Sequence, residues 1–126
     1  MKDHFGCPIQ ATSNVMSGKW KVQILWHLAF GSRRFGELRD LLPGVSEKVL
    51  TAQLRELERD GLVIRVSAES VPPRVDYSLS RAGQQLIPIM EKMCDWAGVY
   101  LGVLPIMPRR PGSRPSDANG NADAAT

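Results

Sequence analysis

The sequence predicts a mainly α-helical fold with a small β-hairpin, arranged as a helix–turn–helix followed by a two-stranded wing. Three observations lead to this prediction. Helical segments precede two short β-rich runs, the turn-forming "LPGVS" links two of those helices, and a long helical segment comes last. The chain has 126 residues, enough for one small domain, and its 43% hydrophobic and 23% charged residues are ordinary for a globular protein.

The first half of the chain carries four predicted helices. "PIQATSNVMSG" indicates a short helix, and "KWKVQILWHLAFG" has apolar residues at helical spacing. Residues 33–35 are expected to form a short strand, and a helix of one to two turns with three leucines then runs to Pro43. Ser46 is a fitting N-cap for the next helix, which is expected to run to about Asp60 and to end at Gly61.

Two β-rich runs, "LVIRVS" and "VDYSLS", come next. In the second run apolar residues alternate with polar ones, as a half-buried strand requires: Val75, Tyr77 and Leu79. The connector "AESVPPR" favours a turn, so the pair predicts a hairpin with an irregular tip. Ser80 is expected to cap a long helix over residues 81–101, which carries more than one apolar stripe and which Pro88 is expected to kink.

The carboxyl-terminal run "PRRPGSRPSDANGNADAAT" contains no large apolar residue and is rich in Pro, Gly, Ser, Asn, Asp and Ala. Such a segment buries too little apolar surface to offset its ordering entropy. We therefore expect one folded domain at residues 1–104 and a disordered tail at 105–126.

Compartment and cofactors are constrained by what the sequence lacks. There is no run of about 18 apolar residues, and "MKDHFGCPIQ" lacks the apolar region of a secretory signal, so no membrane span and a cytoplasmic protein are expected. The two cysteines, Cys7 and Cys94, lie far apart in sequence. They form no disulfide framework and no Cys/His cluster with metal-ligand spacing, so neither a metal nor another cofactor is predicted.

The helix at residues 46–60 has two different sides. On a helical wheel three leucines fall within about 60° of one another and form one apolar face: Leu50, Leu54 and Leu57. The opposite side carries Lys48, Thr51, Ala52, Arg55 and Arg59. Arg and Lys reach guanine edges or phosphates, Thr forms hydrogen bonds, and Ala allows close approach, so this side suits a DNA major groove. Backbone N–H groups near Ser46 also suit a phosphate. A solvated charged face would have the same composition.

Several motifs occur in order over residues 7–96: "CP", "GKW", "RFGEL", "LTAQLRELERDGLV" and "PPRVDYSL". In these motifs the chain resembles the HxlR-type bacterial transcriptional regulators, relatives of the MarR group with a winged helix–turn–helix fold. The resemblance implies a homodimer that binds operator DNA at promoters, with repression favoured and activation left open. It further implies that residues 46–60 enter the major groove and that the hairpin tip, with Arg74, touches the DNA backbone or minor groove. The N- and C-terminal helices would form the dimer.

Cys7 precedes Pro8 at the start of the first predicted helix, a position that favours a reactive thiolate. The resemblance implies that a cysteine in this position senses oxidants or electrophiles, so a small oxidant or electrophile is a candidate effector. A packing role for Cys7 is the alternative. Cys94, among methionines and a tryptophan, is expected in the core or the dimer interface.

An enzyme is not expected from this sequence. His4 and His27 are the two histidines, and His27 lies in the apolar run "ILWHLAF", where a packing role is more common than a catalytic one. No phosphate loop, paired-acid site or nucleophile elbow is present. The alternative to DNA binding is a winged-helix module for protein–protein contact, whose cations meet an acidic protein surface or water. Salt dependence distinguishes the two, because phosphate contacts weaken steeply with salt.

Overall fold

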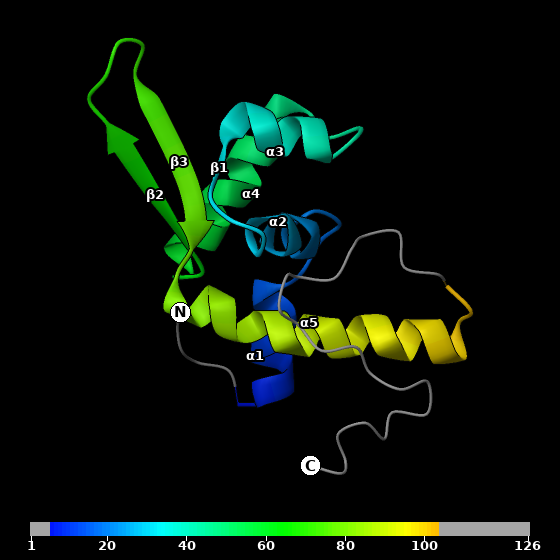
Figure 1. Ribbon diagram of the computed structural model, residues 1–126. Helices are drawn as coiled ribbons and strands as arrows, with labels where there is room; N and C mark the ends of the chain where they lie inside the picture. The colour runs from blue at the N-terminus through cyan, green and yellow to red at the C-terminus, as the bar shows by residue number, and fades with distance from the viewer. Residues whose placement is uncertain (1–5, 104–126) are drawn as a thin grey trace.

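A computed structural model of the chain describes residues 6–103 as five helices and a three-stranded antiparallel sheet (Figure 1). The helices are α1 (Pro8–Val15), α2 (Lys21–Leu28), α3 (Phe35–Leu41), α4 (Glu47–Arg59) and α5 (Arg81–Tyr100). The strands are β1 (Arg33–Arg34), β2 (Val63–Ala68) and β3 (Arg74–Leu79). The predicted mainly α-helical winged helix–turn–helix is confirmed. The predicted tail at 105–126 and the domain boundary at 104 lie outside the described residues.

The core joins α2, α3, α4, α5 and the sheet through side chains that are almost completely buried. The largest of them are Ile24, Leu25, Leu38, Leu42, Leu50, Leu54, Leu57 and Ile87. Burying one such side chain contributes roughly 1.5–3 kcal/mol. Three of these leucines belong to α4, so this helix is held against the core along one whole side. Leu41, the third leucine predicted for the short helix, lies at the surface at 36% exposure.

The sheet has the strand order β1-β3-β2. Strand β2 pairs with β3 from Val63↔Leu79 to Ala68↔Arg74, which confirms the predicted hairpin. Strand β1 adds a third strand on the other side of β3, with Arg33 opposite Tyr77. The short strand predicted for residues 33–35 is confirmed at Arg33–Arg34, but its pairing with β3 was not predicted. Phe35, which was included in the predicted strand, begins α3.

Helix α5 is described as one helix through Pro88, so the expected kink does not divide it into two. Pro88 lies on the exposed side of the helix. At its start α5 comes very close to the segment that leads into β2. A Cβ atom on Gly83 would lie 2.3 Å from the carbonyl oxygen of Leu62, so only glycine fits at this position. Figure 1 shows α5 and α1 on one side of the molecule and the wing, α3 and α4 on the other.

Candidate nucleic-acid interface

Both ends of α4 are fixed by the residues that the sequence predicts there. Ser46 Oγ accepts a hydrogen bond from the backbone N–H of Val49 at 3.1 Å, so Ser46 is the N-cap. Gly61 follows the helix with a φ of 80°, a left-handed conformation that suits glycine. Between these ends the three leucines of α4 are buried. The opposite side of the helix is therefore presented outward at a fixed orientation.

That outward side carries the residues predicted to read DNA. Lys48, Ala52 and Arg55 are exposed and Thr51 is half-buried. Ser46 is exposed at the amino end, where the first backbone N–H groups of a helix lack partners within the helix. We call Ser46, Lys48, Thr51, Ala52 and Arg55 the α4 strip. The strip combines two cations, two hydroxyls and one methyl group, a composition that suits hydrogen bonding to base edges and phosphates.

Two of the carboxylates of α4 are held by cations from other helices. Glu56 Oε1 lies 2.6 Å from Nζ of Lys21 on α2. The hydrogen bond from Lys21, and then the Lys21 charge, lower the pKa of Glu56 below its usual value. Glu47 Oε2 lies 2.7 Å from Nη1 of Arg39 on α3. These two acids are therefore compensated within the protein, and the α4 strip remains cationic.

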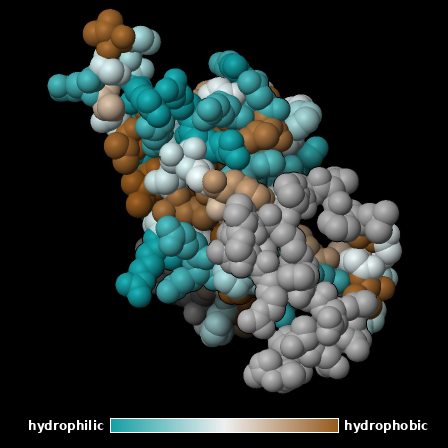
Figure 2. Space-filling model, in the orientation of Figure 1, coloured by the Kyte–Doolittle hydropathy of each residue, from teal (hydrophilic) through white to brown (hydrophobic). Residues whose placement is uncertain are grey.

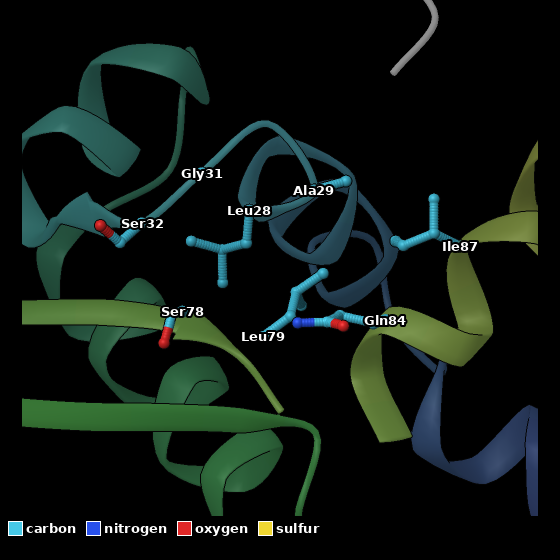
Figure 3. A pocket seen from close by; sticks show the side chains of 8 residues that line it. All are labelled: Leu28, Ala29, Gly31, Ser32, Ser78, Leu79, Gln84 and Ile87. Atoms are coloured by element: carbon cyan, nitrogen blue, oxygen red, sulfur yellow. The ribbon is translucent and has the colours of Figure 1, made fainter. Parts of the chain in front are cut away.

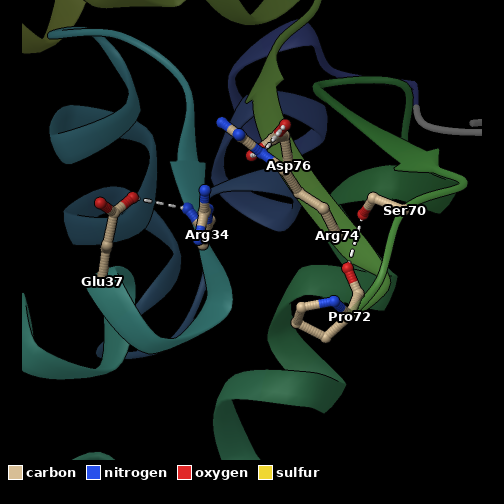
Figure 4. A network of polar contacts seen from close by, with 6 residues as sticks. All are labelled: Arg34, Glu37, Ser70, Pro72, Arg74 and Asp76. Carbon is tan, nitrogen blue, oxygen red and sulfur yellow. Dashed lines mark hydrogen bonds and ion pairs between the residues drawn. The ribbon is translucent and has the colours of Figure 1, made fainter.

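The wing places Arg74 at the first position of β3, at the base of the hairpin tip (Figure 4). Its Nε lies 3.1 Å from Oδ2 of Asp76, two residues further along the strand. These contacts use the Nε–H of Arg74, so the N–H groups on its Nη1 and Nη2 remain for another acceptor. At the end of the neighbouring strand β1, the backbone N–H of Arg34 donates a hydrogen bond to the Glu37 carboxylate of α3 at 2.8 Å, which stabilises the start of α3.

A groove of about 400 Å³ lies between α4 and the wing. We call it the α4–wing groove, and its lining residues are Thr51, Leu54, Arg55, Glu58, Arg65 and Tyr77. Arg65 had no predicted role, although strand alternation contains a signal for it. Arg65 is two residues beyond the buried Val63, so both side chains leave the same face of β2.

Cys7 is exposed and occupies the N-cap position of α1, with Pro8 at the first helical position. Lys2 and His4, the basic residues that precede it in the sequence, lie outside the described residues. Cys94 is also exposed, so its predicted place in the core is wrong for the single chain. It lines an apolar hollow of about 250 Å³ between α2 and α5, beside Trp26 and Met90. A place in a dimer interface stays a prediction.

Helix α5 exposes a broad apolar surface because its apolar residues exceed what one core-facing stripe requires. The exposed large side chains are Ile89, Met93, Trp96, Val99 and Tyr100. Ile9 of α1 is also exposed, and it lines a hollow of about 330 Å³ together with Ile89 and Met93. We call these six residues the α1–α5 face. Apolar residues are also exposed on the wing, where Figure 2 shows hydrophobic side chains along the outer edge of the hairpin and at its tip.

A further hollow of about 310 Å³ lies between the end of α2, β3 and the start of α5 (Figure 3). Its lining residues are Leu28, Ala29, Gly31, Ser32, Ser78, Leu79, Gln84 and Ile87. Two serine hydroxyls and one amide are its polar side-chain groups, so this lining offers no titratable group for acid–base chemistry. His27 is half-buried on α2; burial, and then the charge of Arg33, lower its pKa. It is therefore neutral near pH 7, as a packing histidine is.

Within residues 6–103 no group of three or more His, Cys, Asp or Glu side chains is placed to hold a metal ion. No helix in the same range has the length and apolar character needed to cross a membrane.

A helix–turn–helix whose second helix exposes a cationic strip, followed by a β-hairpin wing, defines a winged helix–turn–helix transcriptional regulator. The family model described as HxlR-like helix-turn-helix matches residues 15–104. The chain belongs to this family of transcriptional regulators, a class without enzymatic activity. The resemblance inferred from the sequence motifs is confirmed.

Relatives and solved structures agree with this assignment. The uncharacterized HTH-type transcriptional regulator YdeP of Bacillus subtilis (strain 168) is 46% identical over 98 residues, which cover 78% of this chain and 77% of YdeP. The crystal structure of the HTH-type transcriptional regulator YtcD is 41% identical, with a TM-score of 0.73 and coverage of 77% of this chain and 99% of that one. The redox regulator HypR in its reduced form is 43% identical, with a TM-score of 0.70 and coverage of 72% of this chain and 90% of the HypR chain.

Proposed function

We propose that this regulator binds a specific DNA operator through the α4 strip and represses transcription there. The observation that carries the proposal is the outward side of α4, whose cations are exposed while two neighbouring carboxylates are held by Lys21 and Arg39. In the bound complex α4 lies in the major groove. Arg74 contacts the backbone or the minor groove. Repression follows when a protein that occupies a promoter excludes other proteins from it.

The regulator acts as a homodimer in this proposal. The α1–α5 face supports this part, because an exposed apolar surface of this kind marks an interaction site. A two-fold dimer formed through α1 and α5 presents two copies of α4 on the same side. Two such helices about one DNA turn apart read two half-sites of a palindromic operator.

Salt dependence tests the DNA-binding proposal. A duplex that the protein enriches from a random-sequence pool is compared with an unrelated duplex of the same length, by fluorescence anisotropy. We expect the affinity to fall steeply between about 50 and about 200 mM salt, because bound phosphates release counterions. Lys48→Ala should weaken binding, whereas Arg81→Ala, which removes an exposed cation at the start of α5, should not. No enrichment and no salt-dependent binding would favour the protein–protein module instead.

The same enriched duplex tests whether the protein represses or activates transcription. Placed within a promoter ahead of a reporter gene, it should lower transcription when the protein is present. An increase would show activation and would contradict repression without affecting the DNA-binding proposal.

Cys7 makes the regulator responsive to oxidants in this proposal. The exposed position of Cys7 beside the α1–α5 face supports the idea, as does the similarity to HypR, a redox regulator solved in reduced and oxidised forms. Two Cys7 thiols, one from each protomer, lose two electrons and two protons to an oxidant such as diamide and form one disulfide. The bond changes how the protomers meet and so changes the spacing of the two α4 helices.

Diamide treatment tests this response directly. The wild-type protein should release the enriched duplex on oxidation, and mass spectrometry should find Cys7 linked to Cys7. Cys7→Ser should keep its DNA under the same treatment, whereas Cys94→Ser should behave as wild type. Release of DNA by oxidised Cys7→Ser would remove Cys7 as the sensor.

A further inference from the structure

The α4–wing groove brings together two arginines that lie on different elements. Arg55 belongs to α4 and Arg65 to β2, and both line the groove. The pairing register places Arg65 directly opposite Tyr77, which is buried. Directly opposed residues in an antiparallel pair project from the same face. The Arg65 side chain therefore leaves the face of the wing that borders α4.

The charges in the groove do not cancel. Glu58 is the one carboxylate in the lining, against the guanidinium groups of Arg55 and Arg65. Within residues 6–103 neither arginine has a carboxylate oxygen within the 4.0 Å of an ion pair, whereas Arg39 has two carboxylate partners and Arg74 has one. Two cations on facing walls repel each other, and an anion between them relieves that repulsion. The groove therefore has the electrostatics of an anion site.

The groove also continues the surface proposed to meet DNA. Thr51 and Arg55 belong to the α4 strip and to the lining of the groove. Lys48 and Ala52 belong to the strip but lie outside that lining. A duplex that places base edges against Lys48 and Ala52 therefore brings one of its backbones toward the groove.

We propose that the α4–wing groove holds the sugar–phosphate backbone of one DNA strand and that Arg65 is a phosphate-contacting residue. The inference rests on the proposed DNA binding and adds a second contact surface to it. Arg65 contributes affinity that does not depend on sequence, because a phosphate carries no sequence information. Sequence readout is left to the part of the α4 strip outside the groove.

Substitutions at Arg65 test the inference on two duplexes, the enriched one and an unrelated one of the same length. Arg65→Ala should weaken binding to both duplexes by the same factor, about 3- to 10-fold, and should reduce the salt slope by about 1. Arg65→Lys should retain most of the affinity because it keeps the positive charge. Arg81→Ala is the matched control, since it removes an exposed arginine outside the groove. Thermal melts of all variants establish that they are folded.

Each outcome has a defined meaning. Equal binding by Arg65→Ala and Arg81→Ala would overturn the role of Arg65 and would leave the proposed DNA binding intact. Loss of affinity for the enriched duplex alone would show that Arg65 reads a base, which also overturns a phosphate contact. Absence of salt-dependent binding by the wild type would overturn both the proposed function and this inference.

Discussion

At the scale of single residues, Lys21 is the charged side chain that the fold buries within residues 6–103, at 4% exposure. Its Nζ lies 2.6 Å from Oε1 of Glu56, whose side chain is 38% exposed. Removing an ammonium group from water carries a free-energy cost on the order of several kcal/mol, which a nearby carboxylate offsets. The pair joins α2 to α4, so it holds α4 at the point where Lys21 enters the core.

The unequal burial of this pair predicts unequal effects of removing either partner. Glu56→Gln leaves a buried, uncompensated cation, and we expect a loss of about 2–3 kcal/mol in the free energy of unfolding, below the usual range for buried pairs because Glu56 is partly exposed. Lys21→Met leaves a carboxylate that water reaches and should cost about 1 kcal/mol or less. Urea unfolding measures both values.

The exposed pair of Arg39 and Glu47 provides the matched control, because it also joins α4 to another helix and has nearly the same length, 2.7 Å. Glu47→Gln should change the free energy of unfolding by less than about 1 kcal/mol. A loss as large as that of Glu56→Gln would show that burial does not decide the strength of the pair.

The ion pair of Lys21 and Glu56 also predicts that the stability of the protein depends on pH. Lys21 lowers the pKa of Glu56 below its usual value of 4.5, first through a hydrogen bond and then through its charge. Since the folded pKa is the lower one, the contribution of Glu56 is fully present above the unfolded pKa and is lost as pH falls through the folded pKa. The stability difference between wild type and Glu56→Gln should therefore shrink below pH 4.5 in urea titrations. A constant difference across acid pH would contradict this assignment.

At the scale of elements, the start of α5 is fastened to the turn that ends α4. Ser80 Oγ donates a hydrogen bond to the carbonyl oxygen of Gly61 at 2.6 Å and accepts one from the backbone N–H of Gly83 at 3.0 Å. The backbone N–H of Ser80 also donates to the carbonyl oxygen of Leu62 at 3.0 Å. The helix with the exposed apolar face is thus tied directly to the end of the helix with the cationic strip.

The close packing at this junction predicts that replacing Gly83 lowers the stability of the protein strongly. Gly36, which lies in α3, is the control for which a small effect is expected. Gly83→Ala places a methyl group 2.3 Å from the carbonyl oxygen of Leu62, so α5 must move away, and we expect a loss of about 2 kcal/mol or more in stability. Gly36→Ala in α3 meets only the end of the Arg39 side chain at 3.7 Å and should be neutral or stabilising by about 1 kcal/mol or less. Thermal unfolding compares them, and equal effects would contradict the steric argument.

Elements differ in how well the sequence predicts them. The limits and buried face of α4 were predictable because Ser46, Gly61 and the spacing of its leucines are local signals. Strand β1 was predictable as a short strand, but its pairing with β3 was not, since that pairing joins segments distant in sequence. The ion pair of Lys21 with Glu56 and the groove shared by Arg55 and Arg65 also depend on the packing of distant segments. The residues of the α4 strip could therefore be predicted from the sequence. The pairing of Glu47 and Glu56 with cations from other helices, and the α4–wing groove, could not.

At the scale of the whole molecule, two surfaces of opposite character lie on elements that share one core. The cations of the α4 strip and of the α4–wing groove belong to α4 and β2, and the α1–α5 face belongs to the helices on the other side of the core (Figure 1). This arrangement suits a dimer that joins through α1 and α5 and leaves both copies of α4 available to one duplex. The two proposed interfaces can therefore be altered separately.

Trp96 is the residue through which the dimer is best tested, because it is 56% exposed and stacks with Tyr100 at a ring-centroid distance of 5.5 Å. We expect the wild type to have twice the 13.9 kDa mass of one chain in light scattering. Trp96→Glu buries a charge in the interface and should raise the dimer dissociation constant by about 30-fold or more, since aromatic interface residues contribute about 2 kcal/mol or more.

The matched control for Trp96→Glu is Val66→Glu, which puts the same charge at a residue of similar exposure, 51%, on the wing. Val66→Glu should leave the mass unchanged, which would separate a specific effect on the α1–α5 face from the general effect of an added charge. Trp96→Glu should also weaken binding to the enriched duplex, because a single protomer engages only one half-site. A wild type with the mass of one chain, or equal masses for the two variants, would contradict dimerisation through this face.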